Sequence, residues 1–340
     1  MKPNALSIAL EVIPRAMGNA VRARLGRFRS WPNDALLIDE PLALAEEKMS
    51  KLNRIYAKAT REVWDGPAVF RAAMEKHNGI QLSQEKRLAL AHPIAMLMWG
   101  ELAAWIVAAE LAERLDDPDA RLAASSQVFD EARHFYILRD YLAALHVPVP
   151  KLDTYFAIGV RRLLDTKDLT VKLFAMQLLA EGTALEIFKF LEEAEIEPVL
   201  TEILPYIEKD ESRHVGLGVL HLPERLAKMT RRQLERVRKI TYGIGDLFGA
   251  TQVRYIKFYQ ILGADPRDLI RRADKRLFDL GERIGPIPGT NRSFFPTNPT
   301  TTPGYEDVLD VILPRPGTAP SFASKVAHGV INFGARALPT

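Results

Sequence analysis

The chain has 340 residues, no cysteine and a formal net charge of +3 at pH 7. A chain without cysteine forms neither disulfides nor a cysteine-ligated iron–sulfur cluster, and so small a net charge gives no basis for nucleic-acid binding. A hydrophobic content of 47% with 26% charged residues is typical of a globular protein with a substantial core. We expect a cytoplasmic protein without a membrane span, because no signal peptide and no sufficiently long uncharged apolar run is evident.

Residues 1–40 form a basic N-terminal extension. Within residues 1–30, six Lys and Arg residues accompany only Glu11, which gives a local charge of 6 − 1 = +5. The stretch is partly amphipathic, so it fits a peripheral contact with anionic lipid, a solvated arm or a homodimer contact. The sequence leaves these alternatives open.

Residues 41–283 are predicted to form one helical domain, with helical periodicity over 41–76, through a central region at 88–225, and again from 229 to about 282. Within the central region two near-identical pentapeptides lie 80 residues apart, Asp130-Glu131-Ala132-Arg133-His134 and Asp210-Glu211-Ser212-Arg213-His214. A further glutamate precedes the glutamate of each pentapeptide by 30 residues, Glu101 in the first case and Glu181 in the second. The chain therefore carries one helix-hairpin half-site twice.

The spacing predicts where each hairpin turns. Two ligands on consecutive antiparallel helices reach the same height only if the turn lies midway between them, near residues 116 and 196. The first midpoint falls in Asp116-Asp117-Pro118-Asp119, where Asp caps a new helix and Pro fits its first turn. The second falls beside Pro198. Each arm is then about 22 Å long, and Glu and His at i and i+3 share a helix face, so four carboxylates and two imidazoles converge in an all-α four-helix bundle.

Burial supports a ligand role for the two isolated glutamates. Residues 91–109 around Glu101 are apolar nearly all round the helix, and Glu181 follows a similar stretch. An ionised carboxylate in such surroundings costs several kcal/mol or more unless it is paired or binds a metal. The alternative is a buried ion-pair network without metal, although two Glu-x-x-His motifs at bundle spacing are a recognised carboxylate–metal arrangement.

The connecting segments show where this bundle ends. Residues 147–169 contain Val-Pro-Val-Pro and a short predicted helix through Arg161, which suits the long crossover between the two half-sites. Six basic residues between 228 and 239 form either a solvated face or a docking surface for an acidic carrier protein or ferredoxin. Residues 284–340 form a Pro/Gly/Thr-rich C-terminal extension, with an extended linker over 284–304 and short apolar patches that wrap over either the bundle or a partner subunit.

These residues resemble the ligand set of the ferritin-like di-iron carboxylate superfamily. That group includes ribonucleotide reductase small subunits, bacterial multicomponent monooxygenases and related oxygenases and oxidases. The resemblance implies a ferritin-like four-helix bundle with additional N- and C-terminal helices and a pair of irons. It places Glu101, Glu131 and His134 on one iron and Glu181, Glu211 and His214 on the other, with some glutamates bridging.

The pentapeptides also predict the residues behind the ligands. A ligating imidazole usually donates its free N–H to a carboxylate, so we expect Asp130 and Asp210 each to serve the histidine of the opposite motif. Arg133 and Arg213 then balance the two aspartates. The alternative is that these four residues cap or solubilise helix surfaces.

No single subfamily fits cleanly. Leu138 stands where ribonucleotide reductases place a radical tyrosine, Leu185 where multicomponent hydroxylases place a threonine, and Ile207 where arylamine N-oxygenases place an extra histidine. Helical neighbours of the ligands predict an apolar substrate pocket with few polar exceptions, and the residues expected to line it are Leu97, Trp105, Gln127, Leu138, Gln177, Leu185 and Ile207.

By resemblance, the expected function is that of a di-iron, O2-dependent oxygenase or oxidase. Its substrate would be a small apolar or aromatic molecule, free or bound to a carrier protein, and the reaction hydroxylation, N-oxygenation or desaturation. Electrons would come from an external reductase or ferredoxin, since the chain has no cysteine for an iron–sulfur cluster. A manganese/iron ligand-binding oxidase and a non-catalytic iron-binding or storage bundle are the alternatives.

Overall fold

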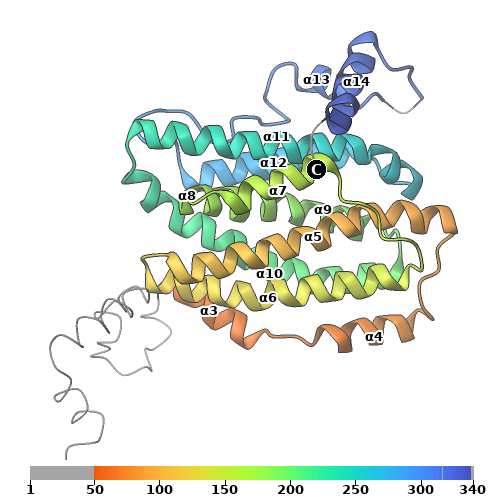
Figure 1. Cartoon of the computed structure of the whole chain (residues 1–340), viewed down its shortest axis with the longest axis horizontal. Helices are drawn as coiled ribbons and strands as arrows, with labels where there is room; N and C mark the ends of the chain where they lie inside the picture. Colours follow the sequence, from red (N-terminus) through yellow and green to blue (C-terminus); the bar gives the residue numbers. More distant parts are fainter. Residues whose placement is uncertain (1–49, 316, 338–340) are drawn as a thin grey trace, which may run out of the picture. The chain divides into compact units, whose positions relative to one another are not determined.

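The structure is a computed structural model and describes residues 50–315 and 317–337. The basic extension at residues 1–40, and the first residues of the predicted helical domain, lie outside the described residues. Within the described part the regular secondary structure is entirely helical, as predicted (Figure 1). The helices are α3 (Lys51–Arg61), α4 (Gly66–Lys76), α5 (Gln84–Arg114), α6 (Pro118–Ala144), α7 (Thr154–Asp165), α8 (Leu169–Leu173), the π-helix η3 (Phe174–Ala180), α9 (Glu181–Glu193), α10 (Pro198–Ala227), α11 (Arg231–Leu262), α12 (Pro266–Ile284), α13 (Tyr305–Ile312) and α14 (Phe322–Ala337).

Two helical hairpins form the centre of the fold, α5 with α6, and η3–α9 with α10. The first turn lies where the spacing predicts it: the Asp117 carboxylate accepts a hydrogen bond from the Asp119 amide at 2.9 Å, and Pro118 starts α6. In the second turn Glu197 caps α10 by accepting from the Leu200 amide at 2.9 Å, again directly before a proline. Because both turns are set by local capping, the four ligand-bearing helices meet in the expected register.

A π-helical segment, which the sequence analysis did not predict, precedes Glu181. It spans Phe174–Ala180 and continues directly into α9. Gly218 of α10 packs against it so closely that a Cβ there would lie 2.6 Å from Cβ of Gln177. The wider π turn thus lies at the contact between the two helices of the second hairpin, directly before Glu181.

Further helices cover this centre. The crossover contains α7, the short helix that the sequence predicts, and α11 packs against both α7 and α5. Residues 285–304 contain no helix, as expected for a linker, whereas the remainder forms α13 and α14. Figure 1 draws these two beside α11, and the Tyr155 hydroxyl of α7 donates to the Ile331 carbonyl of α14 at 2.6 Å. The C-terminal extension therefore packs on its own chain.

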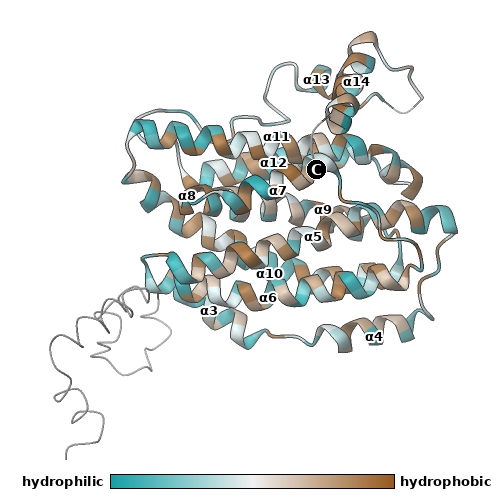
Figure 2. Ribbon diagram, viewed as in Figure 1, coloured by the Kyte–Doolittle hydropathy of each residue, from teal (hydrophilic) through white to brown (hydrophobic). Residues whose placement is uncertain are grey.

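One helix among the described residues, α5, is long and apolar enough to cross a membrane by length and composition. Of its most apolar window, 61% is buried inside the structure, and Figure 2 shows hydrophobic residues along much of its length. Burial on this scale, together with the buried Glu101 near its middle, is typical of a core helix.

Candidate metal centre

Six acidic and imidazole side chains meet in the middle of the bundle. They come from α5, α6, the first residue of α9, and α10, and none is more than 4% exposed. The structure thus brings together every residue singled out from the repeated motif: Glu101, Glu131, His134, Glu181, Glu211 and His214.

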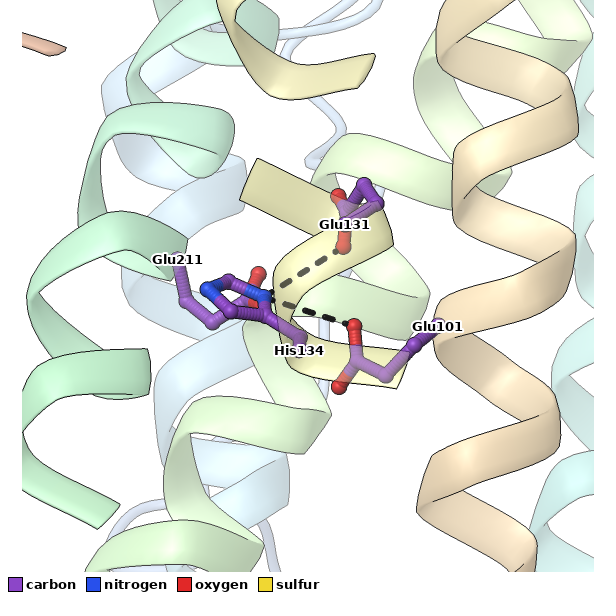
Figure 3. Close-up of side chains that lie close together, drawn as sticks. All are labelled: Glu101, Glu131, His134 and Glu211. Carbon is purple, nitrogen blue, oxygen red and sulfur yellow. Dashed lines mark ion pairs between the residues drawn. The ribbon is translucent and has the colours of Figure 1, made fainter. Parts of the chain in front are cut away.

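The ligand atoms fall into two overlapping groups. Within each group all atoms lie within 4.8 Å of one another. His134 belongs to the first group and His214 to the second, while Glu131 and Glu211 belong to both. In Figure 3 the His134 ring points toward the surrounding carboxylates, and its Nδ1 lies 2.9 Å from Glu211, 3.5 Å from Glu131 and 3.6 Å from Glu101. The two shared glutamates are therefore placed to bridge two ions.

Behind the histidines, the crossed pairing expected from the sequence is present. Nε2 of His134 lies 3.1 Å from Asp210, and Nε2 of His214 lies 3.3 Å from Asp130. Arg133 donates to Asp130 at 2.5 Å and to Asp210 at 2.6 Å, and Arg213 reaches the same two aspartates at 3.0 and 2.5 Å. With each Nε2 directed at a carboxylate, each Nδ1 faces the cluster of glutamates.

Trp64, which the sequence analysis did not identify, contacts the His134–Asp210 pair and not the His214–Asp130 pair. Its indole N–H donates to Asp210 at 2.7 Å, and its ring stacks beside that of His134 with 6.3 Å between centroids. The guanidinium of Arg133 lies 4.6 Å above the indole. Trp64 stands in the short link between α3 and α4, outside any periodic pattern or motif, so no signal in the sequence connects it with the site.

Two glutamines complete the polar network. Gln127 donates to Glu131 at 2.7 Å and to Glu181 at 3.3 Å, and it accepts from Gln177 of the π-helix at 2.8 Å. The sequence analysis assigned both glutamines to the substrate pocket. In the structure Gln127 bonds both carboxylates and Gln177 bonds Gln127, so the pair restrains the orientation of Glu131 and Glu181.

Burial and mutual repulsion strongly perturb the site in the absence of an ion. Burial, followed by repulsion from neighbouring glutamates, raises the pKa of Glu101 and of Glu181 well above the usual value. Burial also opposes ionisation of Glu131, yet the two nearby imidazoles bring its pKa well below the usual value. Burial by itself lowers the pKa of His134, but its bond to Asp210 and the surrounding glutamates raise that pKa well above its ordinary value. Without metal, the cluster therefore holds protons that cations would displace.

The donor set fits two divalent cations. Three buried atoms have no hydrogen-bond partner among the described residues: Oε2 of Glu131, Nδ1 of His134 and Oε1 of Glu211. The last two lie 2.9 Å apart and contact each other only as an ion pair. Buried polar atoms left unpaired are costly unless something else binds them. Four carboxylates carry −4 and two divalent ions +4, so two ions neutralise the cluster while the Asp–Arg pairs behind it balance each other. Carboxylate and imidazole ligands suit manganese and iron.

A narrow apolar cavity of 70 Å³ adjoins Glu101 and Glu181. Of the residues predicted to line a substrate pocket, Leu97 alone lines this cavity. Leu138, Leu185 and Ile207 are packed in the core, and Trp105 is only partly buried. The cavity lies between α5, η3–α9, α7 and α11. The ligand spacing did not predict its lining residues from α7 and α11, which are Phe156, Val160, Leu163 and Phe248.

Comparison with known proteins supports the fold. A scan against protein-family models found no match, and a search of curated protein sequences also found none. Among solved structures, R2-like ligand-binding oxidases share the fold. One variant with an aerobically reconstituted Mn/Fe cofactor has a TM-score of 0.54 at 16% identity, and another with an Fe/Fe cofactor has the same values. A further Mn/Fe variant has a TM-score of 0.55 at 17% identity. Each match covers 69% of this chain and 94% of the other, so the predicted ferritin-like bundle is confirmed.

Proposed function

We propose that this protein is a two-metal oxidase or oxygenase that uses O2 to oxidise an apolar or aromatic organic molecule. The observation that carries the proposal is the pair of overlapping ligand groups, which share Glu131 and Glu211 and contain buried atoms without hydrogen-bond partners. A buried array of four carboxylates and two imidazoles from four helices is the arrangement of di-iron and di-manganese carboxylate proteins.

In this proposal Glu101 and His134 would hold one ion and Glu181 and His214 the other, and Glu131 and Glu211, which belong to both ligand groups, would serve both ions. When bound, the two ions supply the redox chemistry of O2 reduction. The chain's own part begins with its histidines: Asp210 and Asp130 hold a proton on each Nε2, which keeps each Nδ1 free to bind metal.

The hydrogen-bonded glutamines and the apolar cavity complete the chain's contribution. Gln127 restrains Glu131 and Glu181, so the carboxylates do not rearrange freely when charge changes at the site. The cavity wall is apolar apart from Glu101, Glu181, Thr183 and Gln252, which limits water near the ions and favours a substrate without charge at its reacting end.

The size of this cavity restricts what binds without rearrangement. A volume of 70 Å³ is room for about two water molecules. A larger apolar or aromatic ligand requires its walls to move, and Met96 and Met176, both on the lining, are the unbranched and adaptable side chains that permit this. We therefore propose substrate entry by displacement of these methionines.

The metal content is proposed as Fe/Fe, with Mn/Fe as the alternative, because the structurally similar oxidases are described with both cofactors. Since the described residues bring no cysteine or second cofactor-binding motif to the site, we also propose that electrons come from a separate reductase or ferredoxin, or from the substrate.

Metal content per chain tests the proposal first. Protein purified from iron- and manganese-supplemented cells is measured by mass spectrometry, and optical spectra are recorded as O2 meets the reduced form. We expect about two metal ions per chain, and loss of at least one in His214→Ala. His328→Ala, a histidine of α14 far from the cluster in sequence, is the matched control and keeps both. Less than a tenth of an ion per chain after anaerobic Fe(II) addition would contradict the proposal, and O2 consumption without any organic product would favour storage.

A further inference from the structure

The last helix exposes a continuous apolar stripe. Four large side chains of α14 are exposed: Phe322 by 83%, Val326 by 48%, Val330 by 66% and Phe333 by 73%. At 100° per residue these positions fall within an arc of about 80° on one helix face. Scattered exposed hydrophobic residues are ordinary, but a contiguous apolar face marks a surface that binds something.

The orientation of this stripe is set by contacts on the opposite face. Ser324 and Ala335 are buried, the Ile331 carbonyl accepts from Tyr155 at 2.6 Å, and the Asn332 side chain accepts from Arg254 at 2.8 Å. Gly334 lies so close to the Tyr155 hydroxyl that a Cβ would clash with it. α14 is therefore held with one face on the bundle and its apolar stripe directed away from it.

The charged residues of α14 itself are all basic. From residue 311 to residue 340 the chain has no Asp or Glu, and its charged residues are Arg315, Lys325 and Arg336. Lys325 and Arg336 are both exposed, and by helical geometry both lie along one edge of the stripe. An apolar face bordered by basic residues is typical of helices that lie in the surface of an anionic bilayer.

We propose that α14 binds the surface of membranes that contain anionic lipid, with Phe322, Val326, Val330 and Phe333 inserted among the acyl chains. Lys325 and Arg336 contact the lipid headgroups. A second copy of this chain fits the surface less well, because pairing two α14 faces brings basic residues together without an acidic partner on either helix.

Vesicle cosedimentation of the full chain tests the proposal. Wild-type protein is mixed with vesicles of phosphatidylcholine alone or with phosphatidylglycerol added. We expect binding to the anionic vesicles, weakened about tenfold or more by Phe322→Gln combined with Phe333→Gln, and also by Lys325→Gln combined with Arg336→Gln. Ile106→Gln, at a residue of α5 that is 47% exposed, is the matched control and binds as wild type does.

The outcomes separate the occupants of this surface. Binding by the Phe322→Gln/Phe333→Gln variant equal to that of wild type would overturn the proposal and assign lipid contact to another segment. The proposal would also be overturned if wild-type protein does not bind the vesicles and light scattering shows a dimer that the Phe322→Gln/Phe333→Gln variant does not form. A second copy of the chain would then be the occupant of this surface. Because vesicle binding needs no metal, the result does not depend on the proposed oxidase activity.

Discussion

Asp210→Asn is the substitution that tests most directly how the histidine ligands are held. The Asp210 carboxylate accepts four hydrogen bonds, from Trp64, Arg133, His134 and Arg213. An asparagine has one acceptor oxygen, so its NH2 group must face at least one of these donors. Charge-assisted bonds are worth about 1.5–3 kcal/mol each, and disrupting a buried pair costs up to about 5 kcal/mol. We expect about 3 kcal/mol of destabilisation in the metal-free protein.

The same change is expected to weaken metal binding about tenfold to a hundredfold, since residues that orient a ligating histidine typically contribute that much. Urea unfolding followed by circular dichroism measures the stability, and competition with a chelator measures the affinity. Asp140→Asn is the matched control: Asp140 pairs with Arg139 at 2.7 Å on the surface, and its loss is expected to cost less than about 0.5 kcal/mol. If both variants unfold and bind metal alike, the crossed His–Asp pairs do not hold the site as argued.

Three further predictions concern the bridging ligands, the π-helix contact and pH. Glu131 belongs to both ligand groups, so Glu131→Gln is expected to lose both ions, whereas Glu101→Gln is expected to lose one. Metal content is measured by mass spectrometry, and equal losses from the two variants would refute the bridging role of Glu131. Gly218→Ala places a Cβ 2.6 Å from a side chain of the π-helix and is expected to lower the free energy of unfolding in urea by about 1–3 kcal/mol. Gly249 of α11 has open space around it, so the control Gly249→Ala is expected to raise the free energy of unfolding by about 0.5–1 kcal/mol. Burial, together with a neighbouring glutamate, raises the pKa of Glu208 to about 8, so folding takes up a proton and stability falls as pH rises from about 4.5 to about 8; Glu208→Gln flattens this slope, and an unchanged slope would contradict the assignment.

The sequence predicted those parts of the fold that depend on local signals and on exact spacing. Asp117 with Pro118, and Glu197 with Pro198, end one helix and begin the next through capping bonds within the turn itself. Since a rigid helix advances by a fixed rise per residue, turns at those positions bring ligands 30 residues apart to one level. The convergence of the ligand residues followed from that arithmetic.

The features that the sequence did not reveal depend on contacts between distant segments. Trp64 reaches Asp210 across 146 positions of the chain, and nothing near Trp64 marks it as part of a site. The predicted lining differs from the wall of this cavity because the prediction used the neighbours of each candidate ligand along its own helix face. Residues from α7 and α11, Phe156 and Phe248, line the cavity instead. The π turn at Phe174–Ala180 lies where Gly218 of α10 packs closely, a contact between segments that the helical periodicity does not reveal.

Those tertiary contacts also make the two halves of a repeated motif unequal. The pentapeptides differ at one residue only, yet Asp210 receives the Trp64 indole in addition to the arginines, and Glu181 follows a π-helix whereas Glu101 lies within regular α-helix. Gln127 bonds Glu181 but is not a partner of Glu101 in the described structure. Manganese and iron have such similar ligand preferences that proteins distinguish them mainly by geometry and metal availability. Two identical half-sites would offer both ions the same surroundings and could not distinguish manganese from iron. Here the surroundings differ, because Trp64 supports the His134 pair alone and Gln127 bonds Glu181 but not Glu101. A preference for a different metal at each position requires such a difference.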